Sequence, residues 1–132
     1  MTRVLVVDDN EFLRDGLTAV LETAGMIVVG QCPDGIRVVD AFRLGAPDVV
    51  LMDLSMPDVD GVEATRRLLA EEPTARVLIL IGCPSSVSRA LTAGARGYLL
   101  KDGDGDGLVA AVRATAGHPV GARDPSPREA GA

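Results

Sequence analysis

Four side chains in this sequence could act together, because each stands beside a short apolar run. Asp8 and Asp9 follow the run VLVV, Asp53 follows DVVLM, and Lys101 follows GYLL. Adjacent like charges repel unless solvent or a cation screens them. Three carboxylates and a lysine gathered at one place would make a site for a hard divalent cation with a counter-charge. Mg²⁺ suits such a site, because it binds one or two carboxylates, keeps several waters and shares phosphate oxygens.

Each of these residues also has an ordinary structural interpretation. An isolated Asp-Asp pair such as Asp8-Asp9 usually caps a helix. An isolated aspartate such as Asp53 usually belongs to a turn at a strand end, and an isolated lysine such as Lys101 is usually solvated. The cation-site hypothesis therefore requires a fold that brings all four residues to one edge.

Short runs of Val, Ile and Leu alternate strictly with stretches of helical periodicity. The runs are apolar at consecutive positions, which is typical of strands buried on both faces of a parallel sheet. We expect strands at residues 3–7, 26–30, 48–52, 76–81 and 97–100, and helices between Asn10 and Gly25 and at residues 34–45, 61–72, 86–95 and 107–117. This alternation predicts an open, doubly wound α/β fold, a five-stranded parallel sheet with five helices.

A strand order of 2-1-3-4-5 would place the four residues together. In an open α/β sheet, ligands bind beyond the carboxyl ends of the strands, where the strand order reverses. With that strand order the first and third strands are neighbours at this point, so Asp8, Asp9 and Asp53 should converge in one crevice. Lys101, after the fifth strand, should reach the same edge.

Three segments of the sequence resemble a known family in their order and spacing. VLVVDDNEFLRDGL, DVVLMDLSMPDVDGVEATRRL and AGARGYLLKD are similar to the receiver domain of bacterial two-component response regulators. The resemblance extends from residue 3 to about residue 116. It is greatest to the receivers that precede a LuxR-type helix-turn-helix domain.

The resemblance implies a role for each candidate residue. Asp53 would accept a phosphoryl group from a sensor histidine kinase, and Lys101 would pair with the phosphoryl oxygens. Mg²⁺ would be bound by three carboxylates and one main-chain carbonyl, those of Asp8, Asp9, Asp53 and Ser55. A carboxylate can be a nucleophile, but it approaches a phosphoryl dianion only when cations cancel the repulsion. The chain would thus catalyse its own phosphorylation and dephosphorylation, without being an enzyme in the usual sense.

One position departs from the family pattern. Family members usually carry Thr or Ser at the end of the fourth strand, where the hydroxyl follows the phosphoryl group. Here the position is Ile81, followed by Gly82, and an isoleucine side chain offers no hydrogen bond. Tyr98 matches the family's aromatic residue that turns inward on activation. Two hypotheses remain open: a phosphorylation switch, or an interaction module that does not depend on phosphorylation.

Two rival sites lack a required residue. A haloacid-dehalogenase-like phosphatase typically needs a second acid two residues after its nucleophile, and Ser55 stands there. The stretch DGDGDG, residues 102–107, imitates the start of an EF-hand loop, but its twelfth position is Arg113 instead of glutamate. We therefore interpret this stretch as an acidic turn before the last helix.

Composition limits the partners. The chain has 132 residues and a formal net charge of −6, which argues against a non-specific nucleic-acid binder. No apolar run approaches the roughly 20 residues of a membrane span, and the start does not read as a signal peptide. We expect a cytoplasmic protein that binds neither nucleic acid nor membrane. Cys32 and Cys83 lack metal-ligand spacing, so we expect reduced thiols near strand ends.

The domain organisation follows from the same patterns. Residues 1–117 are expected to form the receiver domain. Residues 118–132 combine Gly, Pro and charge without an apolar face, so we expect a flexible tail or the start of a linker. An output domain that regulates transcription is not part of this sequence. Besides a sensor histidine kinase, the expected partner is a second copy, bound through residues 86–95, 97–100 and 107–117.

Overall fold

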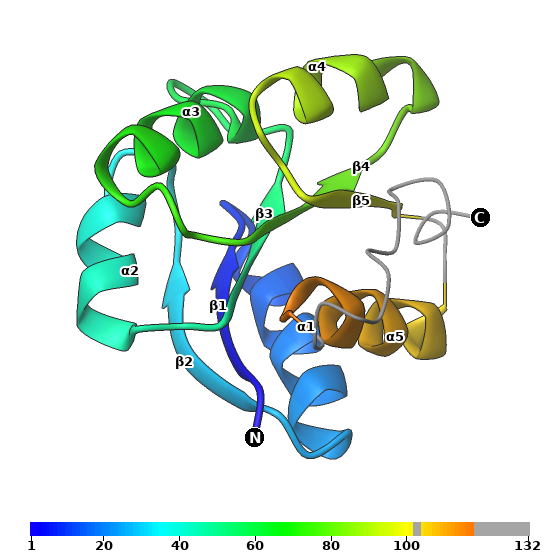
Figure 1. The fold of residues 1–132 in the computed structure, drawn as a ribbon. Helices are drawn as coiled ribbons and strands as arrows, with labels where there is room; N and C mark the ends of the chain where they lie inside the picture. Colours follow the sequence, from blue (N-terminus) through cyan, green and yellow to red (C-terminus); the bar gives the residue numbers. More distant parts are fainter. Residues whose placement is uncertain (102–103, 118–132) are drawn as a thin grey trace.

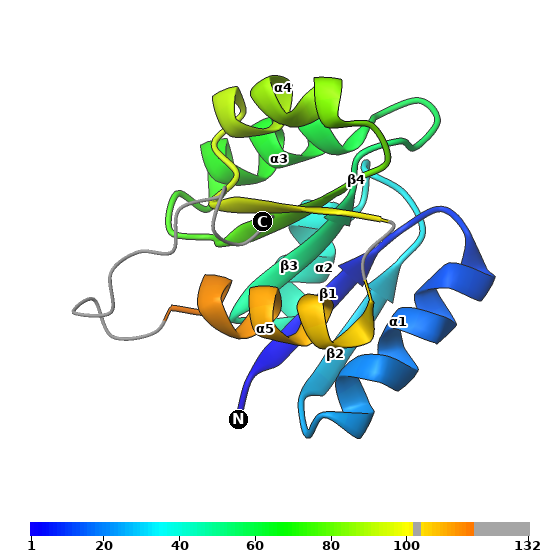
Figure 2. The same ribbon diagram turned by 90° about the vertical axis from the view of Figure 1, so that its right-hand side faces the viewer.

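The computed structural model describes residues 1–101 and 104–117, which form one parallel sheet between two layers of helices (Figures 1 and 2). The strand order is β2-β1-β3-β4-β5, which confirms the predicted doubly wound fold. The elements are β1 (Arg3–Val7), α1 (Glu11–Thr23), β2 (Ile27–Cys32), α2 (Val38–Gly45), β3 (Val49–Asp53), α3 (Gly61–Glu71), β4 (Val77–Ile81), α4 (Val87–Thr92), β5 (Gly97–Leu100) and α5 (Gly105–Thr115). The predicted tail at 118–132, and residues 102–103 of the acidic turn, lie outside the described residues.

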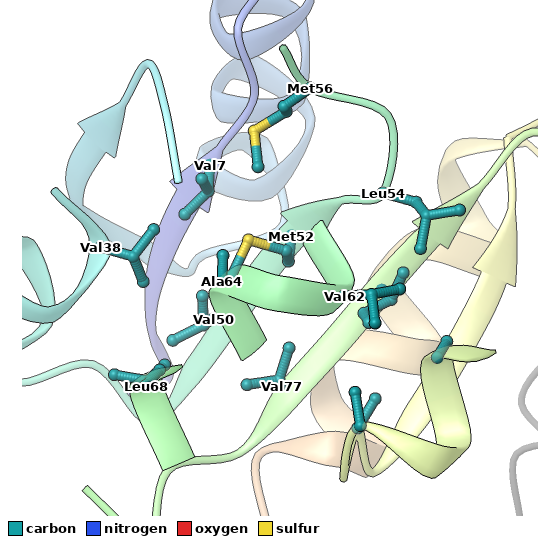
Figure 3. Packing of buried hydrophobic residues seen from close by; sticks show 14 of the residues in the cluster. Val7, Val38, Val50, Met52, Leu54, Met56, Val62, Ala64, Leu68 and Val77 are labelled. Atoms are coloured by element: carbon teal, nitrogen blue, oxygen red, sulfur yellow. The ribbon is translucent and has the colours of Figure 1, made fainter. Parts of the chain in front are cut away.

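The strands build two apolar cores, one on each face of the sheet. On β1, Leu5 and Val7 pack toward α2, α3 and α4, and Figure 3 shows Val7 in this core. Val4 and Val6 pack toward the opposite face, under α1 and α5. Every residue of β3 and β4 is buried. Covering on both faces explains why the strand runs are apolar at consecutive positions.

Side-chain caps set the starts of three helices, α1, α3 and α5. The side chain of Asn10 accepts a hydrogen bond from the N–H of Leu13 at 3.1 Å, so α1 begins as the sequence predicts. Asp104 does the same for the N–H of Gly107 at 2.8 Å, and α5 therefore begins at Gly105, two residues earlier than expected.

Helix α2 begins at Val38, later than the predicted residue 34. The side chain of Asp34 accepts hydrogen bonds from the N–H groups of Ile36 and Arg37, each at 3.0 Å. This local bonding holds a turn in place of the first helical turn.

Helix α4 is also shorter than the predicted 86–95. A single 3₁₀ turn at Pro84–Ser86 precedes it. Gly94, with φ of 106°, follows its end in a left-handed conformation that glycine adopts at no steric cost.

Within the described residues, no helix combines the length and apolarity that a membrane span requires. Both cysteines are free thiols: Cys32 is buried at the end of β2, and Cys83 is exposed two residues after β4.

Gly61 holds the start of α3 directly against the end of β3. A Cβ atom at Gly61 would overlap the carbonyl oxygen of Asp53 and lie 2.8 Å from the Cα of Leu54. Both neighbours are backbone atoms, so they cannot rotate away. We expect Gly61→Ala to lower the free energy of unfolding by about 1–3 kcal/mol, although alanine is the better helix former. Urea denaturation measures this change.

Gly16 provides the matched control in the middle of α1. A Cβ atom there would meet nothing within 4 Å. Gly16→Ala should raise the free energy of unfolding by about 0.5–1 kcal/mol, since alanine loses less conformational entropy in a helix. Equal effects of the two substitutions would contradict the close approach of α3 to β3.

Candidate functional site

Three carboxylates meet at the carboxyl edge of the sheet. One ligand oxygen from each of Asp8, Asp9 and Asp53 lies within 4.8 Å of the other two. They converge because β1 and β3 are adjacent, with Val7 opposite Met52 in register. Asp8 and Asp53 are buried and Asp9 is exposed. The tertiary structure thus brings together the acidic residues that the sequence places at two separate strand ends.

Lys101 brings the counter-charge to this edge. Its Nζ lies 2.5 Å from Oδ1 of Asp53, whose side chain is only 3% exposed. In the described ranges, that buried oxygen has no hydrogen bond of normal geometry besides this ion pair. The N–H of Lys101 donates to the carbonyl oxygen of Ile81 at 2.9 Å, which ties the start of the loop after β5 to β4.

Asp8 is held on two sides. Its N–H donates to the carbonyl oxygen of Cys32 at 3.1 Å, and its Oδ1 accepts from the N–H of Asn10 at 2.9 Å. Burial raises the pKa of the Asp8 carboxyl group above its ordinary value, and the charges of Asp53 and Asp9 raise it further. The hydrogen bond from Asn10 and the charge of Lys101 oppose this rise only in part.

This donor set fits Mg²⁺. Carboxylate oxygens are its preferred protein ligands, and its remaining positions are taken by water or phosphate oxygens. The three carboxylates are close enough to repel one another, while the single ammonium group of Lys101 offsets only one of their charges. A divalent cation would remove the remaining repulsion.

The other predicted site residues flank this cluster. Ser55 is exposed in the loop between β3 and α3, a loop closed by the N–H of Gly61, which donates to the carbonyl oxygen of Leu54 at 2.8 Å. Asp58 in this loop has a left-handed φ of 65°. The structure thus places Ser55 two residues beyond the end of β3, on the side of the carboxylates.

The predicted switch residues lie on β4 and β5. Ile81 is the last residue of β4, and its buried side chain belongs to the core under α2, α3 and α4. Tyr98, on β5, is half-buried and packs against the same core. Gly82 is exposed. No hydroxyl group therefore stands at the end of β4.

Sequence reasoning missed one polar contact to the site. Arg14, on α1, donates through Nη1 to the carbonyl oxygen of Asp8 at 2.7 Å. The available signal was its position one helical turn after the Asn10 cap, which directs the side chain back toward the end of β1.

An apolar cavity of about 370 Å³ adjoins the carboxylates between α1 and α5. Asp8, Lys101 and Asp104 are its charged lining residues. The rest is lined mainly by apolar side chains, among them Phe12, Leu13, Leu17, Leu99 and Leu108. Phe12 is 83% exposed, so α1 presents a large aromatic side chain next to the site.

The raised pKa of Asp8 predicts a pH-dependent cost to the metal-free fold. A carboxyl group with a raised folded-state pKa stabilises the fold below its unfolded pKa, and this contribution is lost as pH rises through the folded pKa. At pH 7 in chelator, Asp8→Asn should therefore raise the thermal midpoint, because asparagine keeps an acceptor for Asn10 without the charge. The gain should shrink as pH falls toward about 4. Thermal unfolding followed by circular dichroism measures both.

Asp40→Asn is the control for a general loss of negative charge, since Asp40 is exposed on α2. It should change the midpoint little at either pH. A lower midpoint for Asp8→Asn at pH 7 would contradict the electrostatic cost assigned to Asp8.

The comparisons with known proteins agree with this geometry. The sequence pattern of the response regulator receiver domain matches residues 4–113. The chain is 40% identical over 116 residues to the response regulator GacA of Pseudomonas aeruginosa, covering 86% of this chain and 54% of GacA. It is 39% identical over 117 residues to the transcriptional regulatory protein DegU of Brevibacillus brevis, covering 86% of this chain and 50% of DegU. The chain thus spans about half the length of these relatives.

A solved structure extends the agreement to the fold. The two-component response regulator of the LuxR family from Aurantimonas sp. SI85-9A1 superimposes with a TM-score of 0.86 and 34% identity, covering 98% of this chain and 93% of that one. The sequence match, the strand order and the fold neighbours lead to one conclusion: the chain belongs to the receiver domain family of two-component response regulators.

Proposed function

We propose that this chain accepts a phosphoryl group on Asp53 from a sensor histidine kinase, in a reaction that requires Mg²⁺. The observation that carries the proposal is the convergence of Asp8, Asp9 and Asp53 around a lysine ion pair at one sheet edge. A cluster of carboxylates at such an edge, one of them, Asp8, with a raised pKa, is typical of a functional site. On this proposal the chain is a phosphoacceptor that catalyses its own modification and dephosphorylation.

The residues divide the work of phosphoryl transfer. A carboxylate oxygen of Asp53 attacks the phosphorus, a P–O bond forms, the P–N bond of the phosphohistidine breaks, and the imidazole nitrogen leaves. Lys101, already 2.5 Å from Asp53, would pair with a phosphoryl oxygen. Asp8, Asp9, Asp53 and the carbonyl group of Ser55 would hold Mg²⁺, which when bound neutralises charge on the phosphoryl oxygens.

Related structures support Mg²⁺ and a phosphoryl group as the species bound at this site. A complex of the chemotaxis proteins CheX and CheY from Borrelia burgdorferi contains BeF₃ and Mg²⁺, and its matching chain has 26% identity and a TM-score of 0.76 to this one. The isolated receiver domain of RcsB from Salmonella enterica was solved with the phosphomimetic BeF₃⁻, at 25% identity and a TM-score of 0.75.

The apolar cavity between α1 and α5 supports a docking place for the kinase. A donor histidine must come within bonding distance of Asp53, so the kinase must cover the surface next to the carboxylates. The exposed side chains of Phe12 and Leu13 line the cavity, as do Asp8 and Lys101. On the proposal, an apolar face of the kinase packs there.

The remaining expectations stay predictions. They place residues 1–117 in the receiver, followed by a tail or linker at 118–132, in a cytoplasmic chain that itself binds neither nucleic acid nor membrane. An output that regulates transcription would be supplied outside this sequence. A homodimer would use α4, β5 and α5, where α4 exposes one large apolar side chain, Leu91. Sedimentation of the chain measures whether it self-associates.

The first test of the proposal is phosphodonor labelling of the wild type and of Asp53→Asn. With acetyl phosphate and Mg²⁺, intact mass should rise by one phosphoryl group in the wild type and stay unchanged in the variant. Chelation of Mg²⁺ should also prevent the rise. Equal labelling of the two proteins would overturn the assignment of Asp53.

Mg²⁺ binding to the folded state alone should stabilise the wild type by mass action. We therefore expect millimolar Mg²⁺ to raise its thermal midpoint and Asp9→Asn to remove most of that gain. Asp40→Asn, an exposed change on α2, should keep it. If Mg²⁺ leaves the thermal midpoint of the wild type unchanged, the three carboxylates do not bind Mg²⁺.

Ile81 predicts a weak response to phosphorylation. A ligand shifts a two-state equilibrium only through different contacts with the two states. A hydrogen bond to a charged oxygen contributes roughly 1.5–3 kcal/mol, about a ten- to hundredfold bias that isoleucine cannot supply. Amide NMR shifts induced by beryllofluoride should therefore stay small at Tyr98 and α4.

Ile81→Thr should enlarge those shifts, since threonine restores a hydroxyl group at the end of β4. Ile81→Val is its matched control, because it shortens the side chain without adding a donor. Large shifts at Tyr98 in the wild type would instead mark a phosphorylation switch that works without this hydroxyl group.

A further inference from the structure

We infer that Arg14 is a positioning residue, which orients Asp9 by holding the peptide group between Asp8 and Asp9. The inference rests on the proposed function, because it concerns how the cation site is held. It adds a residue that lies outside the acidic cluster and the lysine.

The guanidinium group of Arg14 bridges the end of β1 to the edge strand β2. Nη1 donates to the carbonyl oxygen of Asp8 at 2.7 Å, and Nε donates to Oε1 of Gln31 at 3.1 Å. The amide nitrogen of Gln31 in turn donates to Oγ1 of Thr18 at 3.1 Å and to Oδ1 of Asp15 at 3.3 Å, both on α1. Arg14 is therefore itself held in one direction.

Peptide planarity carries this contact to Asp9. The carbonyl group of Asp8 and the N–H of Asp9 belong to one rigid plane, so the bond from Arg14 fixes the direction in which Asp9 leaves it. Within the ranges that the structure describes, the exposed carboxylate of Asp9 accepts no hydrogen bond of its own. Its orientation therefore depends on the backbone.

The two possible roles of Arg14, positioning residue or nearby positive charge, predict opposite changes in Mg²⁺ affinity when Arg14 is removed. As a nearby positive charge alone, Arg14 would repel a cation, and its loss would tighten Mg²⁺ binding. As a positioning residue it preorganises the ligands, and its loss would weaken binding. Residues that orient metal ligands typically contribute about 10–100-fold to affinity. The sign of the change thus separates the two roles.

The test is the Mg²⁺ dissociation constant of the unphosphorylated chain, measured by calorimetry with MgCl₂. Arg14→Met keeps an unbranched apolar stem and removes the donors, and we expect roughly tenfold weaker binding. Arg14→Lys keeps a charge and a donor, and it should recover part of the loss. Arg66→Met, an exposed arginine paired with Glu63 on α3, makes the same change in net charge and should not weaken binding.

A metal-free measurement follows the next peptide group along the chain, between Asp9 and Asn10. The N–H of Asn10 donates to Asp8, so its hydrogen exchange in chelator should speed up in Arg14→Met. Gln31→Met, which alters no charge and removes the acceptor for Nε, should weaken Mg²⁺ binding by a smaller factor. This variant keeps the inference falsifiable if Arg14→Met does not fold.

Unchanged or tighter Mg²⁺ binding by both the Arg14→Met and Gln31→Met proteins would overturn the inference and leave the proposed function intact. A wild-type chain that binds no Mg²⁺ would overturn both. Weaker binding with unchanged exchange at Asn10 would overturn the route through the Asp8–Asp9 peptide.

Discussion

Repulsion among three carboxylates at one edge of the sheet is the constraint around which this domain is built. Asp8, Asp9 and Asp53 present oxygens within 4.8 Å of one another, and two of these side chains are buried. Burial removes the water that would screen them, as the raised pKa of Asp8 shows. The sheet must therefore hold an arrangement that the charges themselves oppose.

The two apolar cores supply the stabilisation that offsets this repulsion. Fully buried residues of β1 and β3 stand immediately before the aspartates, with helices covering both faces of the sheet. Because closely packed protein interiors have low compressibility, the ends of β1 and β3 cannot move apart to reduce the repulsion between the carboxylates. Lys101 offsets one charge directly. On the proposed function, the remaining negative charge would give the edge its affinity for a cation and, with that cation bound, for a phosphoryl group.

Lys101 also connects the cluster to the part of the molecule that would respond. Its ammonium group pairs with Asp53, while its backbone N–H donates to the carbonyl oxygen of Ile81. This second link uses only backbone atoms, so it does not depend on the identity of the side chain at position 81. A hydrogen bond from a hydroxyl group at the end of β4 is a different link, and this chain lacks it there. The buried side chain of Ile81 packs into the core under α4 and has no donor. On the proposed function, acceptance of a phosphoryl group and its transmission would thus be carried by different atoms.

The sequence by itself determined the fold class and the four charged residues at the strand ends. Consecutive apolar runs require burial on both faces, and alternation with helices leaves few topologies for a parallel sheet. Helix starts were less predictable, because at α2 the side chain of Asp34 competes with the helix for backbone N–H groups.

Only the tertiary structure decided how the site is held. Gly61 packs on the backbone of Asp53 because α3 lies close against the sheet. Arg14 reaches the carbonyl oxygen of Asp8 because of the way α1 lies against the sheet. The position of Arg14 one helical turn after the Asn10 cap indicates its direction, but no spacing in the sequence gives either contact distance. The residue types in a sequence indicate which chemistry is available. The distances between side chains of separate elements are set only when the chain packs.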